Sequence, residues 1–167
     1  YVDANILGTL NVLEAARAGE VGRVVQTSTS EVYGTPLYTP IDEKHPLQGQ
    51  SPYSATKIGS DKLAESFWRT YQVPVATLRP FNTFGPRQSA RAILPTIIQQ
   101  ALKGSEIRLG SLTPIRDMNY VGDTVDGFIR IASSDAALGR VANIGSGRGL
   151  TVGGMVDGVA KALGRRV

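Results

Sequence analysis

The chain has no cysteine, a single histidine and no long apolar run among its 167 residues. The missing cysteines exclude disulfides and thiolate metal sites, and they are typical of a protein of the cytoplasm. No apolar run approaches the roughly 18 residues that a membrane span requires, and the chain does not open with the pattern of a secretory signal. We therefore expect a cytoplasmic protein without a membrane partner.

Charge of one sign is not concentrated anywhere in the sequence. The net charge is +4, and the basic residues are separated by apolar ones. This distribution favours an anionic small molecule as ligand over nucleic acid. His45 lies in a polar, proline-bearing stretch with no second metal ligand beside it, so we interpret it as a loop residue.

Helical and strand-like patterns alternate along the chain, which begins at Tyr1 without a methionine and is expected to be a piece of a longer protein. The patterns predict helices over 2–18, 53–71, 92–103 and 123–132, a last helix capped by Thr151, and strands over 24–28, 73–78, 107–109 and 141–144. This alternation predicts an α/β protein with a doubly wound parallel sheet. Ligands of such sheets bind beyond the carboxyl ends of the strands.

Polar residues gather where the first predicted strand ends. Thr29, Ser30 and Glu31 follow the strand over 24–28, and the helix over 53–71 begins about twenty residues later. Ser51 suits the N-cap of that helix and the following proline suits its first position, while Tyr53 and Lys57 are one helical turn apart. A phenol, an ammonium and a hydroxyl cluster are thus expected at one edge of the sheet.

This set of groups is suited to acid–base chemistry at a carbinol. A free tyrosine has a pKa of about 10, which makes it a poor base at neutral pH. The N-terminus of the helix and the Lys57 charge both favour the phenolate of Tyr53, so we expect a lowered pKa for this tyrosine. Thr29 is placed to hold the same substrate oxygen. The alternative is a surface helix with an incidental tyrosine and lysine, because this spacing is common by chance.

The glycine-rich stretch over 145–149 follows a predicted strand and precedes a helix. Its third glycine has the wrong spacing for a dinucleotide-binding motif, and no acidic residue follows about twenty residues on. We interpret it as a tight turn from strand to helix rather than as a phosphate loop.

Taken together, the motifs resemble those of the extended short-chain dehydrogenase/reductase family, the NAD-dependent epimerases and dehydratases of nucleotide sugars. The matching blocks, which occur in the family's order, are NILGTLNVLEAA (5–16), TSTSEVYG (27–34), SPYSATK (51–57), RPFNTFGPR (79–87), RD (116–117) and NIGSG (143–147). The resemblance implies a partial Rossmann-like sheet with part of a small C-terminal substrate domain. It places the Rossmann-like half over 1–86 and the partial substrate region, with interleaved Rossmann elements, over 87–167.

The resemblance also implies a role for each matching side chain, with NAD as cofactor and a nucleotide-diphosphate sugar as substrate. The implied catalytic residues are Thr29, Ser30, Glu31, Tyr53 and Lys57, with Tyr53 as the base. The implied cofactor-binding residues are Thr27, Ser28, Tyr53, Lys57 and Pro80. The implied substrate-binding residues are Asn82, Arg91 and Arg116, and a surface ion pair of Arg116 with its neighbour Asp117 is the alternative for the last.

The family's Gly-rich phosphate loop precedes the point that corresponds to Tyr1. We therefore expect these 167 residues by themselves to be inactive. The helices over 2–18 and 53–71 resemble the pair that forms the family's dimer interface, so we expect a homodimer through them.

Glu31 distinguishes among the chemistries of the family. A carboxylate at this position removes the acidic C5 proton of a 4-keto sugar, which leads to loss of water from C6, whereas an epimerase has no need of it. The stretches IDEKHPL (41–47) and RQSARAILP (87–95) look most like 4,6-dehydratases of the UDP-N-acetylglucosamine type from legionaminic acid pathways. The resemblance thus favours an NAD-dependent nucleotide-sugar 4,6-dehydratase, a lyase. A 4-epimerase, a decarboxylase of the same family and a non-catalytic remnant that pairs with a partner are the alternatives.

Overall fold

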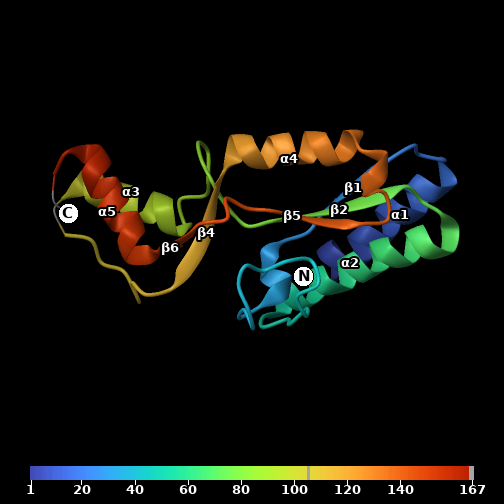
Figure 1. Ribbon diagram of the computed structural model, residues 1–167, viewed down its shortest axis with the longest axis horizontal. Helices are drawn as coiled ribbons and strands as arrows, with labels where there is room; N and C mark the ends of the chain where they lie inside the picture. Colours follow the sequence, from blue (N-terminus) through green and yellow to red (C-terminus); the bar gives the residue numbers. More distant parts are fainter. Residues whose placement is uncertain (105, 166–167) are drawn as a thin grey trace. The chain divides into compact units, whose positions relative to one another are not determined.

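A computed structural model describes residues 1–104 and 106–165 of the chain (Figure 1). These residues form two compact units. The first consists of Tyr1–Phe81 and Asp123–Ile144, and the second of Asn82–Gly122 and Gly145–Val167. The chain therefore leaves the first unit, builds most of the second, returns and leaves again.

A three-stranded parallel sheet forms the centre of the first unit. Its strands are β1 (Val24–Thr27), β2 (Val75–Pro80) and β5 (Val141–Ile144), in the order β1-β2-β5. Val24 is paired with Val75, and Thr77 with Val141. Since all three strands run in the same direction, their carboxyl ends lie at one edge. The predicted α/β class with a parallel sheet is confirmed.

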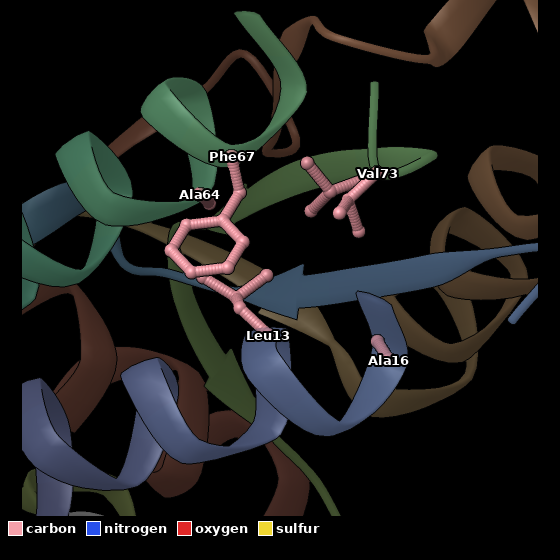
Figure 2. Close-up of a cluster of buried hydrophobic side chains, with 6 residues drawn as sticks. Leu13, Ala16, Ala64, Phe67 and Val73 are labelled. Atoms are coloured by element: carbon pink, nitrogen blue, oxygen red, sulfur yellow. The ribbon is translucent and has the colours of Figure 1, made fainter. Parts of the chain in front are cut away.

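Helices cover both faces of this sheet (Figure 1). The helical elements of the first unit are η1 (Val2–Leu7, a π-helix), α1 (Gly8–Ala18), η2 (Ser30–Tyr33, a 3₁₀ turn), α2 (Pro52–Tyr71), most of α4 (Val121–Ser133) and η3 (Asp135–Ala137). On one face, Leu13 of α1 and Phe67 of α2 pack with Val75 of β2 (Figure 2). On the other face, Ile131 of α4 packs on Ala76, the next residue of β2. The alternation of side chains along the strand thus gives each helical layer its own apolar surface.

The start of α2 is fixed by a reciprocal cap. The Ser51 hydroxyl accepts a hydrogen bond from the Ser54 amide at 3.1 Å, and the Ser54 hydroxyl accepts one from the Ser51 amide at 3.0 Å. Pro52 occupies the first turn, where its missing N–H costs nothing. The predicted cap is confirmed, and it sets the position of Tyr53 just inside the helix.

The described residues of the second unit form a mixed sheet and two helices. Strands β3 (Asn82–Phe84) and β4 (Ile115–Tyr120) are parallel, and β6 (Gly149–Thr151) is antiparallel to β4. Helices α3 (Ile93–Lys103) and α5 (Val152–Leu163) pack together through the buried side chains of Ile97, Ala101, Met155 and Val159. The Thr151 hydroxyl caps α5 by accepting from the Gly154 amide at 3.0 Å, as predicted.

The predicted strand over 107–109 is wrong. These residues are irregular, and Ile107 and Leu109 pack against the α3 and α5 cluster instead of pairing in a sheet. Their apolar character reflects this burial. Within the described part of the chain, no helix is long and apolar enough to cross a membrane.

Candidate active site

The polar turn after β1 is held at both of its ends. Thr29 is extended, with φ −160° and ψ 151°, and its hydroxyl accepts a hydrogen bond from the Glu31 amide at 3.2 Å. Val32 and Tyr33 follow in η2 and are both fully buried. Gly34 ends the turn with φ 65°, where a Cβ would lie 2.7 Å from the carbonyl oxygen of Gln48. The Glu31 side chain is exposed, and the next two residues of the chain, Val32 and Tyr33, are buried.

Tyr53 lies at the first turn of α2 and faces the turn after β1. Burial and the Glu31 carboxylate together raise the pKa of Tyr53 above its ordinary value, and a hydrogen bond with the Thr29 side chain offsets only part of this rise. The structure therefore brings Thr29, Glu31 and Tyr53 together as predicted. The predicted lowering of the Tyr53 pKa is wrong for this chain, because burial outweighs the hydrogen bond and no lysine contribution offsets it.

Lys57 reaches the end of β1. Its Nζ donates to the Thr27 carbonyl oxygen at 2.5 Å. Burial lowers the pKa of Lys57, and the nearby Asp61 carboxylate partly restores it. A half-buried ammonium held on a strand-end carbonyl has further protons to donate to a ligand at this edge.

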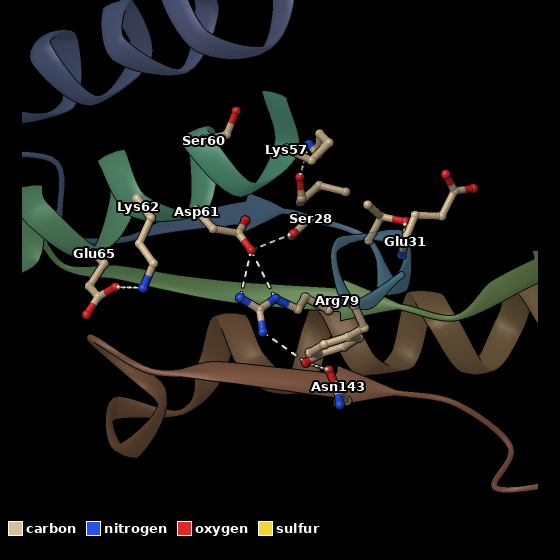
Figure 3. A network of polar contacts seen from close by, with 12 residues as sticks. Ser28, Glu31, Lys57, Ser60, Asp61, Lys62, Glu65, Arg79 and Asn143 are labelled. Carbon is tan, nitrogen blue, oxygen red and sulfur yellow. Dashed lines mark hydrogen bonds and ion pairs between the residues drawn. The ribbon is translucent and has the colours of Figure 1, made fainter. Parts of the chain in front are cut away.

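A buried polar network beneath this edge was missed by the sequence interpretation (Figure 3). Asp61 lies one helical turn beyond Lys57, and its Oδ2 accepts from Ser28 Oγ, Arg79 Nε and Arg79 Nη2, each at 2.9 Å. Arg79 Nη1 in turn donates to the Tyr33 hydroxyl at 2.9 Å. The available signal was a charged residue, Asp61, on the sheet-facing side of α2 and another, Arg79, near the carboxyl end of a buried strand.

The residues predicted to contact the cofactor differ in how accessible they are. Thr27 is exposed at the end of β1, and Pro80 is the half-buried last residue of β2. Ser28 is only 5% exposed and its hydroxyl is given to Asp61, so its side chain is engaged within the protein. A part for Ser28 in cofactor binding stays a prediction.

The residues predicted to bind substrate belong to the second unit. Asn82, Arg91 and Arg116 are all exposed, and Arg116 Nη1 donates to the Ile115 carbonyl oxygen at 2.8 Å. Asp117 binds the turn over 145–149 and is not engaged by its arginine neighbour. Its carboxylate accepts from the Ser146 and Gly147 amides, each at 2.8 Å.

The same contacts fix the conformation of the glycine-rich turn over 145–149. The Ser146 and Gly147 amides donate to the Asp117 carboxylate, and the turn leads into β6 before α5 begins. The interpretation as a tight turn rather than a phosphate loop agrees with this geometry, although a short strand intervenes before the helix.

His45 lies in the loop before α2 but is almost fully buried, at 2% exposure. Its Nε2 accepts from the Leu37 amide at 2.9 Å, and its ring contacts Tyr33 and Tyr38. Both ring nitrogens have partners within the loop, since Nδ1 lies 2.9 Å from the Pro46 carbonyl oxygen. His45 is a structural residue of the loop, and within the described residues no group of three or more potential ligands could hold a metal ion.

Comparison with known proteins finds relatives that match nearly the whole length of this chain. The low-salt glycan biosynthesis protein Agl12 of Haloferax volcanii is 34% identical over 165 residues, which are 98% of this chain and 53% of that protein. The structure of dTDP-glucose 4,6-dehydratase from Bacillus anthracis in complex with NAD has a TM-score of 0.91 and 32% identity, over 98% of this chain and 53% of that one. UDP-N-acetylglucosamine 4-epimerase from Methanobrevibacter ruminantium, in complex with UDP-N-acetylmuramic acid, has a TM-score of 0.92 and 30% identity, over 98% and 54%.

These likenesses confirm the Rossmann-like fold of NAD-dependent epimerases and dehydratases. The family described as GDP-mannose 4,6 dehydratase matches residues 1–167, so the chain belongs to this family of extended short-chain dehydrogenases/reductases. The chain spans about half the length of the relatives that it matches.

Proposed function

We propose that the whole protein carrying this chain is an NAD-dependent nucleotide-sugar 4,6-dehydratase, and that this chain supplies its acid–base residues. The observation that carries the proposal is the placement of an exposed carboxylate, Glu31, on the same turn that brings Thr29 to Tyr53. A 4-epimerase requires the phenol and the threonine but has no step for the carboxylate.

Each side chain has one task in this reaction. Tyr53 takes the proton of the C4 hydroxyl while Thr29 holds its oxygen, which yields a 4-keto sugar. Glu31 then takes the C5 proton, which the ketone has made acidic, and this proton leaves with the C6 hydroxyl as water. At the end C5 takes one proton from the solvent and Tyr53 releases to the solvent the proton that it took, so the sugar loses one water, keeps the C4 ketone and undergoes no net oxidation.

NAD, when bound, supplies the hydride acceptor for C4 and the hydride donor for C6. The residues present fit the nicotinamide end of this cofactor. Lys57 is half-buried at the strand end with protons free for ribose hydroxyls, and Pro80 lies at the exit of β2. The turn over 145–149 does not fit the pyrophosphate, because the Ser146 and Gly147 amides donate to Asp117 and the Arg148 amide donates to Ser146 Oγ.

A nucleotide-diphosphate sugar fits the exposed residues of the second unit. The guanidinium groups of Arg91 and Arg116 match phosphate oxygens, and Asn82 adds an amide. The stretches over 41–47 and 87–95 favour a UDP-N-acetylglucosamine-type substrate. We further propose a homodimer through η1, α1 and α2, which expose several large apolar side chains.

A 4-epimerase is the second candidate. By the resemblance to the family, dTDP-glucose dehydratases carry an aspartate at the place of Ser30 as the acid, whereas GDP-mannose dehydratases share Thr-Ser-Glu with this chain, so the half-buried Ser30 separates the chain from the first group only. The likeness to a UDP-N-acetylglucosamine 4-epimerase supports the epimerase candidate.

Product analysis of the whole protein separates these candidates. We expect incubation with NAD and UDP-N-acetylglucosamine, with dTDP-glucose and GDP-mannose in parallel, to yield a 4-keto-6-deoxy product lighter by one water. An epimeric sugar of unchanged mass would establish the epimerase, and loss of carbon dioxide from a uronic acid substrate would establish the decarboxylase. No turnover of any nucleotide sugar, with NAD bound, would favour a non-catalytic remnant.

A further inference from the structure

We propose that the buried ion pair of Asp61 with Arg79 is a positioning device that holds the turn over 29–34 in register with α2. The inference rests on the proposed function, because it explains how Glu31 and Thr29 are kept at a fixed place relative to Tyr53 and Lys57. None of the network residues needs to touch the substrate.

The network joins four elements at the edge where the proposed chemistry takes place (Figure 3). Asp61 belongs to α2, Ser28 follows β1, Arg79 belongs to β2 and Tyr33 belongs to η2. The Tyr33 hydroxyl also donates to Asn143 Oδ1 of β5 at 2.7 Å. A single chain of hydrogen bonds therefore connects the helix that carries Tyr53 and Lys57 to both ends of the turn that carries Glu31.

Glu31 needs such an anchor because its own contacts are few. Its side chain is exposed, and its amide makes one bond of 3.2 Å to Thr29 Oγ1. The backbone bonds within the turn are long, at 3.4 Å from the Val32 amide and 3.3 Å from the Gly34 amide. From outside the turn, Gln48 donates to the Val32 carbonyl oxygen at 2.8 Å and to the Tyr33 carbonyl oxygen at 3.0 Å. Gln48 holds the backbone at the C-terminal side of the turn, and the side-chain attachments to the sheet and to α2 are Ser28 on the N-terminal side and the buried Tyr33 on the C-terminal side.

The buried Asp61–Arg79 ion pair is better suited to fixing the orientation of its neighbours than to raising the free energy of unfolding. The Asp61 and Arg79 side chains are 2% and 5% exposed, and desolvation of two charges offsets most of their attraction. Asp61 Oδ1 is buried without a hydrogen-bond partner in the part of the chain that the structure describes, which adds a further cost. What the pair does supply is a planar guanidinium fork that fixes Asp61 and Tyr33 in one orientation.

Removal of the Tyr33 hydroxyl tests the device with little change in packing. In the whole protein, we expect Tyr33→Phe to raise amide hydrogen exchange over residues 29–34 about tenfold, with exchange in the C-terminal half of α2 unchanged. Tyr38→Phe is the matched control, because its hydroxyl bonds the exposed Asp42 and its ring also contacts His45. Exchange over 29–34 should be unaltered in this control.

The same variants report on catalysis. We expect Tyr33→Phe to lower kcat for dehydration at least tenfold while KM stays within about threefold, because misplacement of a catalytic group slows chemistry more than binding. Ser28→Ala, which removes the other attachment, should loosen the same residues and lower kcat in the same way. The core variant Val73→Ala provides a stability control, and its kcat should not fall even where its thermal stability falls further.

Unchanged exchange over 29–34 in both Tyr33→Phe and Ser28→Ala would overturn the inference, and so would a loss of kcat in Val73→Ala that matches theirs. These results are separate from the fate of the proposed function. If the unaltered protein forms no dehydrated product, the dehydratase proposal fails, while the exchange experiment still decides whether the network holds the turn.

Discussion

At the scale of single residues, burial governs the acid–base groups. Tyr53 and Lys57 are one turn apart on α2, and burial shifts both pKa values toward the neutral form: upward for the phenol and downward for the ammonium. The spacing of the two residues was predictable, but the balance of burial against charge was not, because it depends on the packing of the turn after β1.

The lowered pKa of Lys57 has a consequence for stability. Between this lowered value and the ordinary lysine value, the unfolded chain binds more protons than the folded one, so folding stability rises with pH. We expect the stability of the unaltered protein to increase as the pH rises toward the ordinary lysine pKa of about 10.4, relative to Lys57→Met, which has no titrating group at this position. Chemical denaturation at several pH values measures this, and parallel curves for the two proteins would contradict it.

At the scale of elements, local signals explain which parts of the fold were predicted. Helix α2 has a serine cap and a proline in its first turn, and the strands of the first sheet are short apolar runs. Strands β3, β4 and β6 carry no such signal, because β4 reads IRDMNY and the other two have three residues each. Their strand conformation comes from pairing with one another, which is information that a local pattern does not contain.

The residues of the candidate site also differ in whether a local sequence pattern predicts them. Thr29, Glu31, Tyr53 and Lys57 lie within two short motifs, so the sequence was sufficient to select them as candidates, and their roles stay predictions. Asp61 and Arg79 are 18 positions apart and are brought together only by the packing of α2 on β2. A charged pair buried through tertiary contact has no local pattern, and for this reason it was missed.

The cap of α2 gives a prediction at this scale. We expect Ser51→Ala to lower the free energy of unfolding by about 1 kcal/mol, because the Ser54 amide loses its acceptor at the helix start. Ser66→Ala is the matched control, since this exposed hydroxyl in the middle of the same helix only bonds the Leu63 carbonyl oxygen. It should change stability by less than about 0.5 kcal/mol. Equal effects of the two substitutions in denaturant titrations would show that the cap is not what fixes the helix start.

At the scale of the whole molecule, each unit is built from segments far apart in the sequence. The first unit contains the acid–base turn and α2, with α4 and β5 added from residues 123–144. The chain returns to the first unit through α4 and β5 before it completes the second, so insertion of one unit within the other is part of the topology.

The proposed homodimer is a prediction at this scale. The helical layer of η1, α1 and α2 exposes Val2, Leu7, Val12 and Tyr71 at 57%, 47%, 59% and 45%. We expect light scattering at micromolar concentration to give a dimer for the whole protein and a monomer for Val12→Glu, since a charge is costly in an apolar interface. Leu102→Glu on α3, where the residue is 63% exposed, is the control and should remain dimeric. A monomeric unaltered protein with an intact fold would refute the proposed interface.

The central claim is that Glu31 is the C5 base of a 4,6-dehydratase. Glu31→Gln in the whole protein retains the shape and most hydrogen bonding but removes the proton acceptor, and loss of a general base typically slows its step by about 10²–10⁴. Oxidation at C4 depends on Tyr53 and Thr29, so the absorbance of reduced cofactor should still rise after mixing with substrate. Deuterium from the solvent at C5 and the 4-keto-6-deoxy product should both be lost, whereas Tyr53→Phe should suppress every step. Product formation by Glu31→Gln within a few-fold of the unaltered enzyme would contradict the account and leave the epimerase as the better assignment.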